Sequence, residues 1–359
     1  MTTTSATASS SPTATAATTT RSSVARPVHH QYDIVENIGH TPLIKLNSFS
    51  VKNVKLYAKL EWFNPFGSVK DRAAYWMIKD AEKRGILKKD KSIIIEPTSG
   101  NTGIALTGIA SALGYKVEIV IPEKVSEETK KILKYLGATL HETSDDLCPR
   151  VGAGTDQSIA LAKAISKPRP DTYYMPNQYE NDANFFAHYE STGPEIWRQT
   201  DGRVTHFLTG CGTGGTITGT GIFLKEMNNN IKVVAIQAQK NHLLQGLRNF
   251  EESSMPDLFK RREHVVDKWM TATNKDSFEM VKHLAVKEHL LVGPSSGSVM
   301  ASMIKTAEEL DSGVVVGIFA DDGRKFKSLY MQQNVFGSEE EYETALKNAM
   351  NLSNLAYNL

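Results

Sequence analysis

The sequence predicts an α/β protein built on two mostly parallel sheets. Two stretches carry this prediction, residues 92–123 and residues 205–239, because each contains an apolar strand, a polar loop with glycines, a helix and another apolar strand. Strands that are apolar at nearly every position are typical of parallel sheets covered by helices on both faces. We therefore expect two three-layer α/β domains with a cleft between them.

Four parts are expected along the chain. Residues 1–31 are rich in Ser, Thr and Ala and are expected to form a disordered tail. Residues 64–181 are assigned to a smaller N-terminal domain, and residues 32–63 together with 182–336 to a larger C-terminal domain. Residues 337–359 are expected to form a helix and a polar tail at the surface.

A helix is predicted to begin within 61-EWFNPFGSVKDRAAYW-76. Ser68 followed three residues later by Asp71 is a capping-box pattern, and the apolar residues beyond it keep a helical spacing until Gly85. This places Lys70 in the first turn, where the helix dipole disfavours an ammonium by roughly 0.3–1 kcal/mol. The same dipole favours a neutral amine, the form that attacks an aldehyde or accepts a proton. Taken alone, a solvated lysine that tolerates the penalty is the more frequent explanation.

Three more elements are predicted further along the chain. Residues 125–140 form a helix that Ser126 caps and Gly137 ends, and we assign it a packing role only. Apolar strands follow at 290–293 and 314–320, and each runs into a polar turn. Ligands of open α/β sheets bind beyond the carboxyl ends of the strands. The loops TSGNTG, GCGTGG, GPSSGS and ADDG are therefore expected to share one cleft.

A glycine-rich loop joins strand to helix in the second unit. Residues 210–215 match the G-x-G-x-x-G spacing, so a dinucleotide site must be considered. Such a site needs an acidic residue at the end of the next strand, and here that strand ends 233-VVAIQAQ-239. The small residues from Gly212 to Thr216 instead offer backbone N–H groups and the positive end of a helix to a phosphate. A tight, close-packed turn is the alternative explanation.

The loop 98-TSGNTG-103 has the same placement in the first unit. Its hydroxyl and amide side chains lie at a helix N-terminus, which suits a carboxylate. A helix cap would explain one of these residues but not the whole cluster. A phosphate on one side, a carboxylate on the other and Lys70 between them describe pyridoxal phosphate holding an amino acid.

Composition and charge argue against several other classes of protein. The formal charge of the 359 residues is +1, which speaks against nucleic acid or an anionic membrane as a partner. Cys148 and Cys211 form neither a CxxC pair nor a Cys/His cluster, so no disulfide framework and no metal site are predicted. No apolar run approaches the ~20 residues that span a bilayer. We expect a cytoplasmic protein, or an organellar one if residues 1–31 are a transit peptide.

Four motifs, in their order and spacing, match those of a known family. NPFGSVKDR with Lys70, TSGNTG with Asn101, GCGTGGT and GPSSGS resemble the cysteine synthase/cystathionine β-synthase family of fold type II pyridoxal-phosphate enzymes. The resemblance runs from about residue 33 to residue 336. It implies the tryptophan synthase β-like fold, with the cofactor in the cleft between two domains, and a homodimer.

The resemblance implies a role for each matching residue. Lys70 would bond covalently to pyridoxal 5'-phosphate, Asn101 would meet its ring hydroxyl and Ser295 its ring nitrogen. The cofactor phosphate would be held by Gly212, Thr213, Gly214, Gly215 and Thr216, and the substrate carboxylate by Thr98, Ser99, Thr102 and Gln178. A hydroxyl at Ser295 does not force protonation of the ring nitrogen, so loss of a β-substituent is favoured over transamination. Lys70 would take the α-proton, an aminoacrylate would form and a sulfur nucleophile would add.

The expected donor follows from a narrower resemblance. Residues 245–259 and 320–330 look most like those of the O-phosphoserine sulfhydrylases, in which Arg248 would face the leaving group. A guanidinium suits a phosphate better than a neutral ester, since a charge-assisted hydrogen bond contributes about 1.5–3 kcal/mol. The expected reaction makes L-cysteine from O-phospho-L-serine, with sulfur arriving as sulfide or on a carrier protein. A surface arginine that supports a loop is the alternative for Arg248.

Other functions stay open at this point. An O-acetylserine sulfhydrylase, or a cystathionine β-synthase that joins serine to homocysteine, would use the same family motifs. A nicotinamide-dependent dehydrogenase is a distant alternative because the ribose-binding acid is missing. A family member kept only as a binding protein is disfavoured by the intact Lys70, Asn101 and Ser295. Residues 144–157 have no predicted role.

Overall fold

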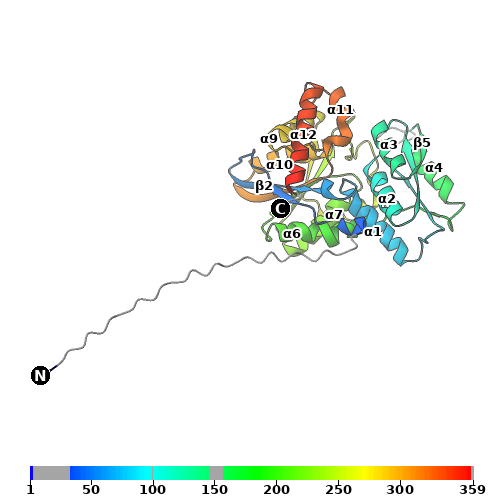
Figure 1. The fold of residues 1–359 in the computed structure, drawn as a ribbon, viewed down its shortest axis with the longest axis horizontal. Helices are drawn as coiled ribbons and strands as arrows, with labels where there is room; N and C mark the ends of the chain where they lie inside the picture. Colours follow the sequence, from blue (N-terminus) through cyan, green and yellow to red (C-terminus); the bar gives the residue numbers. More distant parts are fainter. Residues whose placement is uncertain (3–32, 99, 145–156, 357–359) are drawn as a thin grey trace. The chain divides into compact units, whose positions relative to one another are not determined.

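Two sheets organise the part of the chain that the computed structural model describes, residues 1–2, 33–98, 100–144 and 157–356 (Figure 1). One sheet has six strands in the order β1, β2, β10, β7, β8, β9, and the other has four in the order β5, β4, β3, β6. Among these strands only the β1–β2 pair is antiparallel. The predicted α/β class with mostly parallel sheets is confirmed.

The strands are short, as expected for segments buried between helices. Their bounds are β1 Leu43–Lys45, β2 Asn53–Leu60, β3 Ile93–Pro97, β4 Lys116–Pro122, β5 Thr139–Thr143, β6 Tyr173–Tyr174, β7 His206–Gly210, β8 Lys232–Ala238, β9 Lys268–Ala272 and β10 Ser312–Phe319. The two units that predicted the fold correspond to β3, α2 and β4 and to β7, α7 and β8. Each unit contributes to a different sheet.

Helices connect the strands. The α-helices are α1 Lys70–Lys83, α2 Asn101–Ala112, α3 Glu127–Tyr135, α4 Gln157–Ser166, α5 Asp182–Ala187, α6 Gly193–Gln199, α7 Gly215–Met227, α8 Asp257–Lys260, α9 Asn274–Lys287, α10 Pro294–Glu308, α11 Lys327–Gln332 and α12 Glu339–Ala356. Short 3-10 turns are η1 Ile34–Asn37, η2 Glu61–Phe63, η4 Glu263–Val265 and η5 Gly323–Phe326, and η3 His188–Thr192 is a π-helical turn. Figure 1 shows α2, α3 and α4 together with β5, and α9, α10 and α12 grouped away from them.

The six-stranded sheet buries both of its faces. Leu208 and Val234 pack in one apolar cluster with Val299 of α10, whereas their neighbours Phe207 and Val233 pack in another cluster with Ile217 of α7. Successive residues of a strand point to opposite faces, so strands apolar at every position fill both layers. This is the physical reason for the continuous apolar runs in the sequence.

The four-stranded sheet is covered in the same way. Ile94 and Ile119 share one cluster with Ile109 of α2, and Ile95 and Val120 share another with α4. The helix predicted at 125–140 is present as α3, and Ser126 accepts a hydrogen bond from the backbone N–H of Thr129 at 3.3 Å. Both sheets are therefore central layers between helices. The predicted boundaries, 64–181 against 32–63 with 182–336, stay a prediction.

Two expectations about the C-terminal part are wrong. Residues 290–293 do not form a strand, because only Val292 pairs there, in an isolated bridge with Asp322. The predicted C-terminal helix is present as α12, but it is not merely at the surface, since Tyr342 and Ala345 are 1% and 5% exposed and belong to the main core cluster. A helix with one apolar stripe can bury that stripe while the rest faces solvent.

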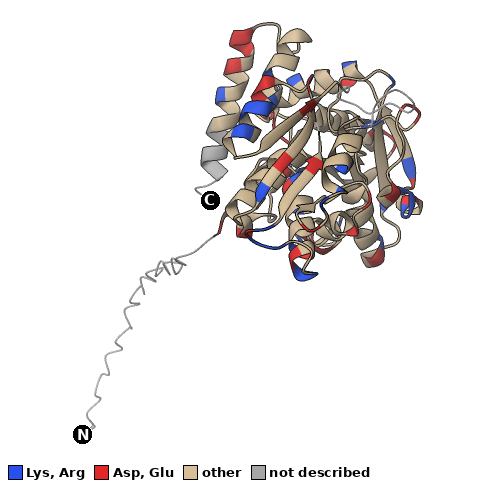
Figure 2. Ribbon diagram, turned by 90° about the vertical axis from the view of Figure 1, so that its right-hand side faces the viewer, with Lys and Arg blue, Asp and Glu red and all other residues tan. Residues whose placement is uncertain are grey.

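The distribution of charge and the apolarity of the helices bear on the predictions about nucleic acid and membranes. Figure 2 shows lysines and arginines mixed with aspartates and glutamates along the elements that it draws. None of the described helices is long and apolar enough to cross a membrane. Residues 3–31 of the predicted tail, Cys148 and residues 145–156 of the unassigned segment lie outside the described residues.

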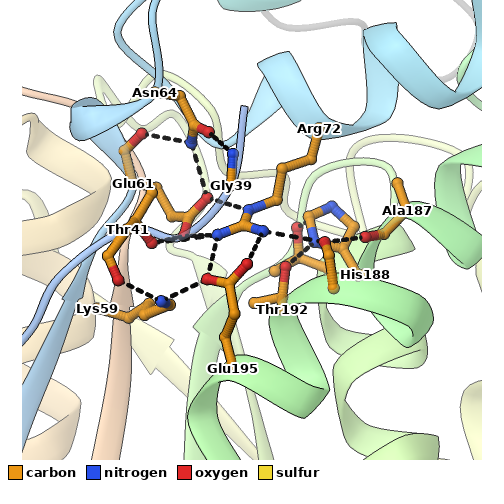
Figure 3. A network of polar contacts seen from close by, with 12 residues as sticks. Gly39, Thr41, Lys59, Glu61, Asn64, Arg72, Ala187, His188, Thr192 and Glu195 are labelled. Carbon is orange, nitrogen blue, oxygen red and sulfur yellow. Dashed lines mark hydrogen bonds and ion pairs between the residues drawn. The ribbon is translucent and has the colours of Figure 1, made fainter. Parts of the chain in front are cut away.

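A network of buried ions joins α1 to the six-stranded sheet (Figure 3). Arg72 donates to Glu61 (Nε to Oε2, 2.7 Å) and to Glu195 (Nη1 to Oε1, 2.7 Å), and Lys59 donates to Glu195 Oε2 at 2.6 Å. Arg72 is 1% exposed, and Lys59 and Glu61 are fully buried. Burial opposes ionisation of Glu61, yet Arg72 and Lys59 hold the pKa of its carboxyl below the usual value. Each charge in this network has an opposite charge beside it.

Candidate active site

Lys70 is the first residue of α1, as predicted, but the capping box does not form. Ser68 Oγ accepts from the backbone N–H of Lys70 at 3.2 Å, and Asp71 Oδ2 accepts from the backbone N–H of Phe66 at 2.6 Å. The N-cap residue is Val69, with no side-chain cap. Asp71 therefore closes the loop before the helix instead of capping the helix itself. The result is a tight turn that presents Lys70 at the helix start.

The pKa of the Lys70 amine is lowered to about 8. Burial is the largest cause, the Asp321 carboxylate opposes it, and the Arg248 guanidinium adds to it. The direction of this shift agrees with the prediction, but its largest cause is burial, which the sequence did not suggest. With this pKa, roughly a tenth of the amine is neutral at pH 7. Such an amine can attack an aldehyde without a separate base.

A hydroxyl and amide cluster surrounds the start of α2. Thr102 Oγ1 donates to Gln178 Oε1 at 2.8 Å, which leaves the amide N–H groups of Gln178 available to an acceptor. Thr98 Oγ1 accepts from the backbone N–H of Gly100 at 3.3 Å. Gln178 and Thr98 are buried. Ser99, the fourth residue predicted to bind a carboxylate, lies outside the described residues.

The glycine-rich loop forms a close turn at the start of α7. Gly214 has a φ of +91°, and a Cβ on Gly215 would lie 2.1 Å from Oδ1 of Asn184. Asn184 is held in turn, since its Nδ2 donates to Thr213 Oγ1 at 3.0 Å. The absence of side chains leaves the backbone N–H groups of the helix end open to a bound anion. The loop therefore has the form that a phosphate cradle requires.

Two adjoining cavities bring the predicted residues together. The larger, of about 230 Å³, is lined by Lys70, Thr98, Asn101, Thr102, Gln178, Gly212, Thr213 and Arg248. The smaller, of about 60 Å³, is lined by Lys70, Asn101, Gly212, Thr213, Gly214, Thr216 and Ser295. Lys70, Asn101, Gly212 and Thr213 line both cavities, as do Gln245, Gly246 and Leu247. Loops from both sheets thus meet at one site, as expected for the carboxyl ends of parallel strands.

Arg248 enters the larger cavity from the loop after β8. Its guanidinium lies 4.8 Å from the centre of the Tyr179 ring, and Nη1 donates to the backbone carbonyl of Ser254 at 3.4 Å. Among the described residues it forms no ion pair with a carboxylate. The positive charge is therefore available to a ligand.

The structure adds residues to the site that the sequence did not single out. Asp321 Oδ2 accepts from Asn101 Nδ2 at 2.7 Å, and Lys325 Nζ donates to Asn101 Oδ1 at 2.7 Å. The ADDG loop was expected in the cleft, so it is a signal for Asp321, but the motif gives no sign of Lys325. Glu96, at the end of β3, accepts the backbone N–H groups of Asn177 and Gln178 at 2.9 and 3.0 Å.

His188 contacts the last residue of the glycine-rich loop. Its Nε2 lies 3.2 Å from Thr216 Oγ1 and its Nδ1 lies 2.9 Å from Thr192 Oγ1. Burial lowers the pKa of His188 to about 3, so the ring is neutral at pH 7. A neutral imidazole between two hydroxyls orients Thr216 without adding charge. No local pattern in the sequence pointed to this histidine.

Comparison with known proteins agrees with this geometry. A family model described as "Pyridoxal-phosphate dependent enzyme" matches residues 34–321. The chain is 43% identical over 302 residues to a cysteine synthase of Aquifex aeolicus, which covers 82% of this chain and 90% of the relative. It is 36% identical over 348 residues to a cystathionine beta-synthase of Apis mellifera, which covers 90% of this chain and 68% of the relative.

A solved structure extends the likeness to three dimensions. The O-acetylserine dependent cystathionine beta-synthase from Helicobacter pylori matches with a TM-score of 0.75 and 33% identity, over 82% of this chain and 96% of that one. The chain belongs to the pyridoxal-phosphate dependent enzymes and, within them, to the cysteine synthase/cystathionine β-synthase family. Its cofactor is pyridoxal 5'-phosphate, as the motifs predicted.

The residues present fit this cofactor. The turn at the start of α7 leaves no room for a Cβ on Gly215 beside Asn184, and the Lys70 amine, whose pKa is lowered, lines the adjoining cavity. Ser295, Asn101 and the loop from Gly212 to Thr216 would hold the group, and Lys70 would bond to its aldehyde. When bound, the cofactor supplies an electron-withdrawing ring that stabilises negative charge at the substrate α-carbon.

Proposed function

We propose that this chain makes L-cysteine by β-replacement, with O-phospho-L-serine as the favoured donor and sulfide as the nucleophile. The Arg248 guanidinium is the observation that carries the choice of donor. It lines the same cavity as Lys70 and has no carboxylate partner among the described residues. A leaving group with two negative charges would complete its pairing, whereas a neutral acetyl ester would not.

The other polar residues of the cavity support the same reaction. Gln178 and the hydroxyls of Thr98 and Thr102 bind the substrate carboxylate at the start of α2. Lys70 removes the proton at the substrate α-carbon and returns one after sulfur has added, which its pKa of about 8 permits near neutral pH. Arg248 holds the departing phosphate.

A comparison of donors tests the proposal. Stopped-flow absorption of the bound cofactor measures the rate at which O-phosphoserine and O-acetylserine each lose the β-substituent. The wild type is expected to react faster with O-phosphoserine. Arg248→Ala is expected to lower kcat/KM for O-phosphoserine by about 10–100-fold, the value of one charge-assisted hydrogen bond, and to leave O-acetylserine within about threefold.

Arg203→Ala is the control, because it removes an arginine that is exposed and paired with Asp201. It should leave the donor preference unchanged. If Arg248→Ala keeps the preference for O-phosphoserine, Arg248 does not select the donor. If the wild type prefers O-acetylserine, the donor assignment is wrong, although β-replacement would stand.

O-acetylserine and serine are the competing donors. The Helicobacter pylori relative is described as O-acetylserine dependent, and the Apis mellifera relative is a cystathionine beta-synthase. A cystathionine synthase would require homocysteine in place of sulfide, which the same assay measures directly. The homodimer, the cytoplasmic location and the route by which sulfur arrives belong to this proposal and stay predictions.

A further inference from the structure

A lysine and an aspartate that lie close together in the sequence both form hydrogen bonds with the side chain of Asn101. Lys325 belongs to η5, and Asp321 lies four residues earlier, in the short segment between β10 and η5. We propose that Lys325 and Asp321 are positioning residues that lock the Asn101 amide in one orientation and present its remaining N–H to the cofactor ring. This inference rests on the proposed role of Asn101 toward the ring hydroxyl.

The hydrogen bonds specify which way the amide faces. Lys325 Nζ, which can only donate, lies 2.7 Å from Asn101 Oδ1. Asp321 Oδ2, which accepts when ionised, lies 2.7 Å from Asn101 Nδ2. A flipped amide would set an N–H group against the ammonium and a carbonyl against the carboxylate. Opposite charges at the two ends therefore remove the ambiguity that an asparagine normally has.

One N–H of the amide is left over. Nδ2 carries two hydrogens, and Asp321 is its only hydrogen-bond partner within the described part of the chain. Asn101 lines both cavities, and the smaller one also contains Lys70 and Ser295. The free N–H is thus available where a cofactor ring would lie between the lysine and Ser295.

Lys325 also ties the amide to the loop that carries the reactive lysine. Its Nζ donates a second hydrogen bond to the backbone carbonyl of Gly67 at 3.1 Å, three residues before Lys70. The same loop pairs with the aspartate, because Ser68 and Asp321 form an isolated β-bridge. The clamp therefore sets the distance between the lysine loop and the start of α2.

Burial and an unpaired oxygen place the Asp321 carboxylate at an energetic disadvantage. Asp321 is 2% exposed, and its Oδ1 has no hydrogen-bond partner within the described residues. Gly293 makes room for it, since a Cβ there would lie 2.0 Å from Oδ1. Burial raises the pKa of the Asp321 carboxyl, and Lys325 and Asn101 oppose this rise. Burying a carboxylate with an open oxygen is unfavourable, so such groups concentrate at functional sites.

The clamp should affect the ring oxygen of the cofactor. An ammonium on the amide oxygen draws electrons from the amide, which makes its free N–H a stronger donor. A stronger donor favours the ionised form of the ring oxygen. Loss of Lys325 is therefore expected to weaken cofactor binding and to reduce the long-wavelength absorption that reports the ionised ring oxygen.

The test compares three variants with the wild-type protein. Lys325→Met removes the charge, Lys325→Arg restores a donor, and Lys327→Met is the control, because Lys327 pairs instead with Glu339 and Glu343 on α12. Titration of each cofactor-free protein with pyridoxal 5'-phosphate gives the dissociation constant, and absorption spectra give the band ratio. Lys325→Met is expected to bind about tenfold more weakly with a smaller long-wavelength band. Lys325→Arg and Lys327→Met should stay close to wild type.

A fourth variant separates this inference from the role of Asn101 itself. Asn101→Ala should change affinity and spectrum at least as much as Lys325→Met, and adding Lys325→Met to it should change little more. If Asn101→Ala has no effect, the assigned role of Asn101 fails. If Asn101→Ala has its effect but Lys325→Met binds the cofactor like wild type, the clamp alone is overturned.

Discussion

Two clusters of charged residues begin within one turn of α1. The Arg72 network is buried, whereas Lys70 and Arg248 are only partly buried, and the two clusters differ in how completely their charges are paired. Around Arg72, every ion has an opposite ion within hydrogen-bonding distance, and the pKa of Glu61 is held low (Figure 3). Around Lys70, the amine has no hydrogen bond within the described residues, Arg248 has no ion pair and one oxygen of Asp321 has no partner.

The difference separates stability from function. Burying paired ions is tolerable because each partner offsets part of the desolvation of the other. Burying single charges is unfavourable, and the unmet hydrogen-bonding capacity remains available to a ligand. The Arg72 network holds α1 against the sheet, so that Lys70, two residues away, can be left without a partner.

The largest expected effect comes from removing the reactive amine. Lys70→Ala should lower the rate of β-replacement by about 10²–10⁴-fold or more, because the group that moves the α-proton is lost. It should leave the free energy of unfolding of the cofactor-free protein unchanged or higher, since no paired ion is broken. Steady-state kinetics and urea unfolding measure the two quantities. Lys79→Ala, on the exposed side of α1, is the control. A strongly destabilised Lys70→Ala protein would contradict the comparison.

Breaking the paired network should act on stability instead. Arg72→Met leaves Glu61 and Glu195 buried with one cation fewer, and we expect the free energy of unfolding to fall by about 3–5 kcal/mol. Arg84→Met removes an exposed arginine at the other end of α1, paired with Asp80, and should change the free energy of unfolding by less than about 1 kcal/mol. Urea midpoints at equal slope give both values. Equal losses in the two variants would show that the network is not stabilising.

Glu96 tests how much a neighbouring cation matters to a buried carboxylate. Glu96 is fully buried like Glu61 but has no cation beside it, and burial raises its pKa to about 7 despite two backbone N–H donors. In the unfolded chain its pKa is near 4.5. The folded state then binds the proton more tightly, so this contribution to stability is present below pH 4.5 and is lost as pH rises through 7.

Glu96→Gln removes that dependence. Between pH 4.5 and pH 7 the wild type should lose about 2–3 kcal/mol of unfolding free energy relative to the variant. Urea unfolding of cofactor-free protein at several pH values measures the difference. Glu180→Gln, an exposed glutamate of the neighbouring loop, should run parallel to wild type. A constant gap between wild type and Glu96→Gln would mean that Glu96 keeps an ordinary pKa in the folded protein.

Much of the site could be predicted because its parts are local. Lys70 at a helix start, the turn at Gly214 and the hydroxyl cluster before α2 each depend on residues within one loop. Two local predictions still failed. The capping box at Ser68 lost to a hydrogen bond between Asp71 and the backbone of Phe66, and the strand at 290–293 found only one pairing partner. In both places, hydrogen bonds with residues outside the local pattern, present at Phe66 and limited to Asp322 at 290–293, decided the structure.

The sequence by itself determined the α/β class, the order of its elements and the motifs assigned to the cofactor, because periodicity and turn chemistry act between near neighbours. Only the tertiary structure decided which charges meet. Asn101 is bound by residues 220 and 224 positions away, and Glu96 holds a backbone N–H group 82 positions on. Such contacts depend on how the two sheets close around one cavity. The partners of Lys325, Glu96 and His188 therefore appear only once the chain has folded.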